Sequence, residues 1–232
     1  MRIGVHIPCY RLTYFLPAVL RSVSWMDRIL VTNSFKPWDS NVLEVDDTVK
    51  VCSNANLDNL ELLRGNWSKD SEHNQRNMAM NVLSDCDYVF LLDSDEIMNL
   101  GDQRRILEVA AQTPEMEAFG VRTIPYFNDL SHMALYDEGN TPLALVKPSV
   151  RFFITRCITQ PWKDLSTQFS IHHFKFLQPK SDIGWRNGAK HTDQCRKFNG
   201  VVPIKKNIEL ESFMESCGYT NFKSELQDIE VA

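Results

Sequence analysis

The sequence predicts an α/β fold in which a mostly parallel, Rossmann-like sheet is flanked by helices on both faces. Three observations predict it: short apolar runs alternate with segments of helical periodicity, the run 88–92 is apolar on both faces, and three carboxylates follow that run directly. A strand that is apolar on both faces is typical of the centre of a parallel sheet. Strands that alternate with helices imply crossover connections, and ligands bind beyond the carboxyl ends of such strands.

The alternation is clearest in the first hundred residues. Apolar runs of strand length predict strands over 3–7, 28–32, 49–53 and 88–92. Helical spacing and capping residues predict a helix after Thr13, a helix from Ser71 to about Leu83 and a helix from Asp102. In the second of these helices the buried face is expected to contain Met78, Ala79, Val82 and Leu83.

The pattern weakens in the second half of the chain. We expect strands over 119–127, 150–154 and 169–176, and a short helix over 208–217. The segment 180–200 is polar and irregular. A length of 232 residues without a linker or a repeat favours a single domain over 1–232.

Composition narrows the functional classes. The formal net charge is −5 and no stretch is strongly basic, which argues against binding driven by nucleic-acid phosphates. The six cysteines form no CxxC pair, which favours reduced thiols. Met1 leads straight into a strand-like run, and no apolar run approaches the roughly 20 residues of a membrane span. We therefore expect a cytoplasmic protein without a transmembrane segment.

The acidic turn after the central strand, Asp93-Ser94-Asp95-Glu96, is the strongest candidate site. Its three carboxylates repel one another unless a cation or hydrogen-bond donors neutralise them. Mg²⁺ and Mn²⁺ prefer carboxylate oxygens and leave positions for phosphate oxygens. Such an ion could bridge the protein to a diphosphate and stabilise it as it leaves. The alternative is a solvated acidic turn that caps the next helix.

The run 67–98 resembles the core of family 2 glycosyltransferases of the GT-A fold. The matching features are Trp67, the pair Arg76-Asn77, the strand 88–92 and the acidic turn. Two shorter stretches are similar to the nucleotide-contacting turns of that family, namely 6–10 and 32–34. The resemblance covers about residues 2–100. It implies that 1–100 is the nucleotide-sugar-binding half and 101–232 the acceptor-binding half.

The resemblance also implies roles for individual residues. Asp95 would bind the metal directly, Asp93 would contact the ribose or the metal through water, and Glu96 would lie near the transferred sugar. Arg76 would face the diphosphate, which suits its planar fork of donors. Nucleoside contacts would come from Pro8, Tyr10, Asn33 and Trp67. The plainer alternatives are a surface arginine at Arg76 and simple packing at Trp67.

The acceptor half matches the family less well. An inverting enzyme needs a carboxylate base, and the candidates are Asp129, Asp137 and Glu138. Related enzymes add a late histidine as a metal ligand. His173 fits this role better than His172, which points to the opposite face of the strand, and His191 is a weaker alternative. Lys175 would share the face of His173 and meet a phosphate.

These features together predict a metal-dependent glycosyltransferase that moves a sugar from a nucleoside-diphosphate sugar to an acceptor hydroxyl, with inversion. The cofactor would be Mn²⁺ or Mg²⁺. One alternative is a phage-type enzyme that glycosylates hydroxymethylated bases in DNA, which the acidic charge disfavours. A second is a nucleotidyltransferase, although residues 8–11 lack the glycines of a phosphate loop. A third is a non-enzymatic nucleotide- or sugar-binding scaffold, which the intact acidic turn disfavours.

Overall fold

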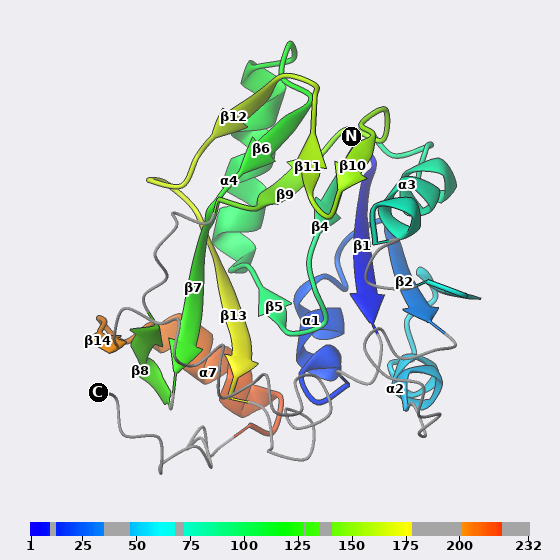
Figure 1. The fold of residues 1–232 in the computed structure, drawn as a ribbon. Helices are drawn as coiled ribbons and strands as arrows, with labels where there is room; N and C mark the ends of the chain where they lie inside the picture. Colours follow the sequence, from blue (N-terminus) through cyan, green and yellow to red (C-terminus); the bar gives the residue numbers. More distant parts are fainter. Residues whose placement is uncertain are drawn as a thin grey trace.

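The computed structural model describes residues 1–9, 13–34, 47–67, 72–127, 129–134, 141–177 and 201–219. These residues form two β-sheets with helices packed against them (Figure 1). Within these ranges no helix is both long enough and apolar enough to cross a bilayer. The cysteines of the same ranges are free thiols: Cys9, Cys52, Cys86, Cys157 and Cys217.

Helices and strands alternate in the first half of the chain, and strands dominate the second. The helices are α1 (Leu16–Ser22), α2 (Thr48–Asn54), α3 (Glu72–Val82), α4 (Leu100–Gln112) and α7 (Ile208–Ser216). The larger sheet contains β1 (Ile3–Cys9), β2 (Arg28–Ser34), β3 (Leu60–Gly65), β4 (Tyr88–Leu91), β6 (Ala118–Gly120), β9 (Leu143–Val146) and β12 (Trp162–Asp164). The smaller sheet contains β5 (Glu96–Ile97), β7 (Arg122–Phe127), β8 (Asp129–Ala134), β13 (Ser170–Phe176) and β14 (Val201–Pro203). A separate hairpin pairs β10 (Phe152–Ile154) with β11 (Cys157–Ile158).

The larger sheet has the strand order β12-β6-β9-β4-β1-β2-β3. Strand β1 runs parallel to β2 and to β4, and β3 continues this parallel group beyond β2. Strand β9 is antiparallel to both of its neighbours. The expected mostly parallel sheet is therefore confirmed, and its strands come from both halves of the chain. The carboxyl ends of β1 to β4 meet at one edge, where a ligand is expected.

Alternation of side chains along the central strands builds a core on each face of this sheet. Val5, Ile29 and Phe90 lie in the core that α1, α2, α4 and α7 cover. Val89 and Leu91 lie in the second core, with residues of α3 and the β10 strand. Every residue of β4 is buried, as the apolar run 88–92 predicts for a strand enclosed on both faces.

The smaller sheet is joined to the larger one through the acidic turn. Strand β5 begins at Glu96, directly after that turn, and pairs antiparallel with β13. Strand β13 also pairs with β7, which follows β6 after the single residue Val121. In Figure 1 the β7–β13 pair lies below the main sheet, on the left. This arrangement brings residues near position 173 beside residues near position 95.

Two predicted features of the first hundred residues are wrong. Residues 49–53 belong to α2, because a short apolar run alone does not distinguish a helix from a strand. The third parallel strand is instead β3, whose edge position leaves its side chains partly exposed. The hydroxyl of Thr13 does not cap α1; the Thr13 carbonyl accepts from the Leu16 N–H in a turn that precedes the helix.

Two further predictions need correction. The expected strand 119–127 is two strands in different sheets, β6 and β7. The chain passes from one sheet to the other at Val121. Gly120 before it lies against the Trp162 ring, where an added Cβ would sit 2.9 Å from the ring. The buried face of α3 contains Gln75, Arg76, Ala79 and Met80, whereas Met78 and Val82 are only half-buried. The two polar side chains of this face have buried partners: Arg76 reaches Asp93 of the acidic turn, and Gln75 donates to Thr32 of β2.

Candidate active site at the carboxyl ends of the parallel strands

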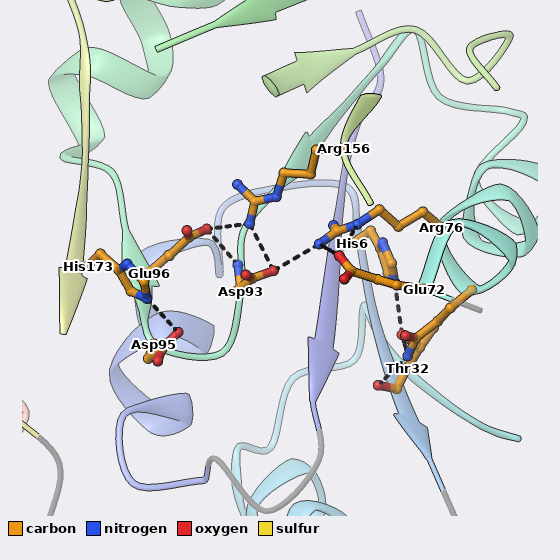
Figure 2. Close-up of polar contacts among 10 residues, drawn as sticks. His6, Thr32, Glu72, Arg76, Asp93, Asp95, Glu96, Arg156 and His173 are labelled. Atoms are coloured by element: carbon orange, nitrogen blue, oxygen red, sulfur yellow. Dashed lines mark hydrogen bonds and ion pairs between the residues drawn. The ribbon is translucent and has the colours of Figure 1, made fainter. Parts of the chain in front are cut away.

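The acidic turn lies where the fold predicts a ligand, just past the carboxyl end of β4 (Figure 2). The Leu92 N–H donates to the His6 carbonyl of β1, and the Glu96 N–H donates to the Asp93 carbonyl to close the turn. Ser94, Asp95 and Glu96 are buried, which a solvated capping turn would not require. Burial of several carboxylates demands charged partners close by.

Asp93 is held by two arginines that come from different parts of the chain. Arg76 on α3 donates to its carboxylate at 3.2 Å, and Arg156 from the β10–β11 hairpin lies 2.8 Å from the same oxygen. Burial opposes ionisation of Asp93, but Arg156 and Arg76 outweigh it and hold its pKa well below the usual range. Asp93 is thus a carboxylate at any physiological pH, although its side chain is 36% exposed.

Glu72 and Glu96 complete the ion-pair network around the two guanidinium groups. Glu72, one turn before Arg76 on α3, accepts from its Nη2 at 2.6 Å and from its Nε at 3.0 Å. Glu96 accepts from Arg156 at 2.6 Å and from the Asp93 backbone N–H at 2.8 Å. Burial alone would lower the pKa of Arg156, but Asp93 and Glu96 raise it above its ordinary value. Nη1 of each arginine is buried and has no acceptor among the described residues.

Asp95 faces away from this network and towards β13. Its Oδ1 lies 3.5 Å from Nε2 of His173, and its side chain is 1% exposed. The backbone fixes this approach, because His173 pairs with Glu96 in the β13–β5 ladder and the Phe174 N–H donates to the Asp95 carbonyl. The neighbouring His172 points the other way and is hydrogen-bonded to the Tyr126 hydroxyl at 2.8 Å. The expected difference between the two histidines is therefore present.

A buried polar chain lies beneath the arginines. His6 of β1 is hydrogen-bonded through Nε2 to the Thr32 hydroxyl at 2.8 Å, and Gln75 of α3 donates to the same hydroxyl at 2.7 Å. Burial lowers the pKa of His6 well below its usual value, and the charges of Arg76 and Arg156 lower it further. His6 is consequently neutral, and adds no charge to the site.

The predicted nucleoside contacts lie along the same edge of the sheet, at the ends of β1, β2 and β3. Pro8 pairs with Thr32 in the β1–β2 ladder. The buried Asn33 donates to the Cys9 carbonyl at 3.3 Å and accepts from Arg64 Nε at 3.0 Å. Trp67 packs its ring on Gly65, where an added Cβ would come within 2.7 Å of it. These residues share an edge with the acidic turn, but their contact with a nucleoside stays a prediction.

Of the three predicted catalytic bases, only Asp129 lies among the described residues. Asp129 begins β8, three strands from β5 in the smaller sheet, which separates it from the acidic turn by roughly 14 Å across the sheet. A further displacement along the strands adds to this separation, because Asp129 is level with Phe176 and Glu96 with His173. The Asp129 carboxylate accepts from the Ser131 N–H and from His132 within β8. The other predicted site residues lie outside the described residues: Tyr10, Asp137, Glu138, His191 and the side chain of Lys175.

Sequence reasoning missed Arg156, which contacts two of the three carboxylates. A signal existed, since Thr155-Arg156 forms a polar pair between two strand-like runs, but nothing local shows that the hairpin reaches the acidic turn. Glu72 was also missed, although a glutamate four residues before an arginine on a helix predicts an ion pair.

The donor set fits a divalent cation that shares its coordination with a ligand. No cluster of three or more metal-ligating side chains occurs among the described residues. Asp95 and His173 form a pair, and two ligands about 2.1 Å from one octahedral ion are themselves about 3 Å apart, close to their 3.5 Å separation. Three carboxylates (Glu72, Asp93 and Glu96) face two guanidinium groups, and Asp95 adds a fourth negative charge beside His173, which leaves negative charge for such an ion to balance. Mg²⁺ and Mn²⁺ commonly take their remaining ligands from phosphates and water.

Comparison with known proteins gives a likeness in structure only. No family model matches the sequence, and no curated protein matches it. The structure of S. aureus TarS 1-349 in complex with UDP-GlcNAc matches at a TM-score of 0.52 and 13% identity, over 75% of this chain and 59% of that one. A longer TarS structure matches at 0.53 and 12%, over 92% of this chain and 43% of that one.

These matches bear on the fold. The chain spans about three fifths of the TarS 1-349 structure. The resemblance inferred from the sequence is confirmed as a likeness in fold, an α/β arrangement like that of TarS, although identity is low. At such identity the likeness shows the fold alone, and the activity of TarS does not transfer with it.

Proposed function

We propose that this protein is a metal-dependent glycosyltransferase that moves a sugar from a nucleoside-diphosphate sugar to an acceptor hydroxyl. The observation that carries the proposal is the arrangement around the acidic turn. Asp95 faces His173 on one side of the turn, and Asp93 meets Arg76 and Arg156 on the other. Two possible metal ligands beside two arginines, at the carboxyl edge of a parallel sheet, suit a diphosphate that is bound through a divalent ion.

In this proposal each group of residues has one task. Asp95 and His173 would hold the Mn²⁺ or Mg²⁺, which would supply Lewis-acid stabilisation of the departing diphosphate. The buried Nη1 groups of Arg76 and Arg156 would donate to oxygens of the bound donor, because buried donors are normally satisfied. Pro8, Asn33 and Trp67 would contact the nucleoside, and neutral His6 would add no charge near the arginines.

The fold likeness to TarS crystallised with UDP-GlcNAc makes a uridine nucleotide the first donor to try. In this proposal the residues after position 100 bind the acceptor, set the linkage and supply the base that activates the acceptor. Asp129, Asp137 and Glu138 remain the candidates for that base, and inversion remains the expected stereochemistry. A cytoplasmic location and an acceptor reached from the cytosol complete the proposal.

The experiment is release of nucleoside diphosphate from a panel of UDP-, GDP- and dTDP-sugars, and of CMP from a CMP-sugar, with Mn²⁺. We expect the wild type to turn over one donor class slowly with water and faster with an acceptor extract. Asp95→Ala should lose this turnover by at least a hundredfold while its circular dichroism spectrum is unchanged. Binding of a nucleotide without any turnover in the wild type would instead support the scaffold alternative.

A further inference from the structure

The β10–β11 hairpin reaches the site from outside the parallel sheet, and its tip is built to place one side chain. Arg156 follows Thr155, which has a φ of 37°. A β-branched residue rarely adopts a left-handed conformation, and the surrounding structure must hold it there. Arg156 then turns inward to the acidic turn (Figure 2), whereas Phe153 and Ile154 before it are exposed.

The hairpin is fastened to the helix that carries the other arginine of the site. Asn77 on α3 donates to the Phe152 carbonyl at 2.8 Å and accepts from the Phe152 N–H at 2.8 Å. Asn77 follows Arg76 in the sequence. The pair Arg76-Asn77 therefore places both guanidinium groups, one directly and one through the docked hairpin.

We infer that Arg156 is a positioning residue that keeps Asp93 and Glu96 out of the metal's coordination, so that a divalent cation is taken up together with the diphosphate rather than before it. Its Nη2 lies 2.8 Å from Asp93 and 2.6 Å from Glu96. While both carboxylates are bound to a guanidinium group, Asp95 and His173 are the pair that would hold the ion among the residues that the structure describes. A two-ligand site is weak until phosphate oxygens join it.

This inference rests on the proposed function for its meaning, but its test uses the metal alone. The full-length chain is titrated with Mn²⁺ in the absence of nucleotide, and free Mn²⁺ is followed by its electron paramagnetic resonance signal. Arg156→Met should bind Mn²⁺ at least tenfold more tightly than the wild type, because Glu96 loses its guanidinium partner and Asp93 keeps only Arg76, so that Glu96 can join Asp95. Arg156→Lys, which keeps the charge, should stay near the wild-type affinity.

Two controls isolate the effect. Arg151→Met removes an exposed arginine just before the same hairpin, whose contacts are to Pro148, Val150 and Asn81, and should leave Mn²⁺ affinity unchanged. Adding Glu96→Gln to Arg156→Met should reverse most of the gained affinity. If Arg156→Met does not fold, Arg156→Gln takes its place with the same expected result.

A folded Arg156→Met or Arg156→Gln variant that binds Mn²⁺ no better than the wild type would overturn the inference. Failure of the inference is distinguishable from failure of the proposed function, which is tested by nucleotide binding and by donor turnover in the wild type. If the wild type binds UDP with Mn²⁺ and Arg156→Met has the Mn²⁺ affinity of the wild type, only the role of the hairpin is rejected. A gain in Mn²⁺ affinity without nucleotide binding supports the hairpin's role and rejects the function.

Discussion

Arg76 shows how a single buried residue can hold two carboxylates of the site. Its side chain is 1% exposed, and it bonds Glu72 and Asp93 at once. The sequence-based alternative of a surface arginine does not fit this burial. A buried guanidinium is tolerated when its partners are carboxylates in good geometry, and removal of one partner leaves the others uncompensated.

Replacing Arg76 should therefore destabilise the protein more than most single changes. We expect Arg76→Met to lower the free energy of unfolding by about 2–3 kcal/mol, measured by urea denaturation, because Glu72 loses its charged partner. Arg104→Met is the matched control on an exposed position of α4, and should cost under about 0.5 kcal/mol. Equal losses in the two variants would contradict the network drawn here.

His172 makes a prediction about pH. Burial lowers its pKa from 6.5 to about 4, and the group facing it is the Tyr126 hydroxyl. The unfolded chain therefore binds a proton between pH 6.5 and 4 that the folded chain does not, so stability falls as the pH falls through this window. His6 is lowered in the same direction and adds to the effect.

The variant that tests this is His172→Asn, whose amide can keep a hydrogen bond to Tyr126 without titrating. The wild type should lose up to about 1.4 kcal/mol per pH unit from His172 alone within the window. Urea denaturation at pH 7.0, 6.0 and 5.0 should show a shallower decline for His172→Asn than for the wild type. Parallel declines would show that His172 is not the group responsible.

At the scale of elements, the β10–β11 hairpin and the β5–β13 ladder decide which side chains meet. The hairpin places Arg156 in the site through its contact with Asn77 of α3, and the ladder places His173 beside Asp95. Both are pairings between segments at least 70 residues apart in the sequence. The ladder depends on backbone hydrogen bonds, and the contact of the hairpin with α3 depends on the Asn77 side chain, so neither depends on the side chain that it places in the site.

Loss of the dock should be measurable as stability. Asn77→Ala leaves the N–H and carbonyl of Phe152 without their side-chain partners, which should cost about 1–3 kcal/mol in urea denaturation. Asn81→Ala, one turn later on the same helix and exposed, removes only an acceptor for Arg151 and should cost much less. A cost for Asn81→Ala as large as that for Asn77→Ala would argue against a docked hairpin.

Local patterns predicted some elements well and others poorly, for physical reasons. Strands β1, β2 and β4 were predicted correctly from their apolar runs, and helices α3 and α4 from their helical periodicity. Residues 49–53 were misassigned because an apolar run of five residues fits a helix as well as a strand. The strand 119–127 was misassigned because its break at Val121 is a tertiary event: β6 pairs with β9 and β12, whereas β7 pairs with β8 and β13.

At the scale of the whole molecule, one edge of the main sheet follows from the sequence, and the side chains that reach this edge from elsewhere need the fold. The positions of the acidic turn, Pro8 and Asn33 could be predicted because parallel strands end together, and the position of Arg76 because it lies on the helix that precedes β4. Arg156 could not, because its partners are 60 or more residues away and no periodicity marks it. The fold likeness to TarS bears on the architecture alone.

The central claim is that Asp95 and His173 bind a divalent cation together with a nucleoside diphosphate. The most direct measurement is thermal unfolding with UDP, GDP, CMP or dTDP, each with and without Mn²⁺. At a hundred times its Kd, one nucleotide should stabilise the wild type by about 2.7 kcal/mol, or roughly 5–10 °C, only when Mn²⁺ is present. Asp95→Ala and His173→Ala should lose this shift. No shift with any nucleotide, or an equal shift in both variants, would contradict the account.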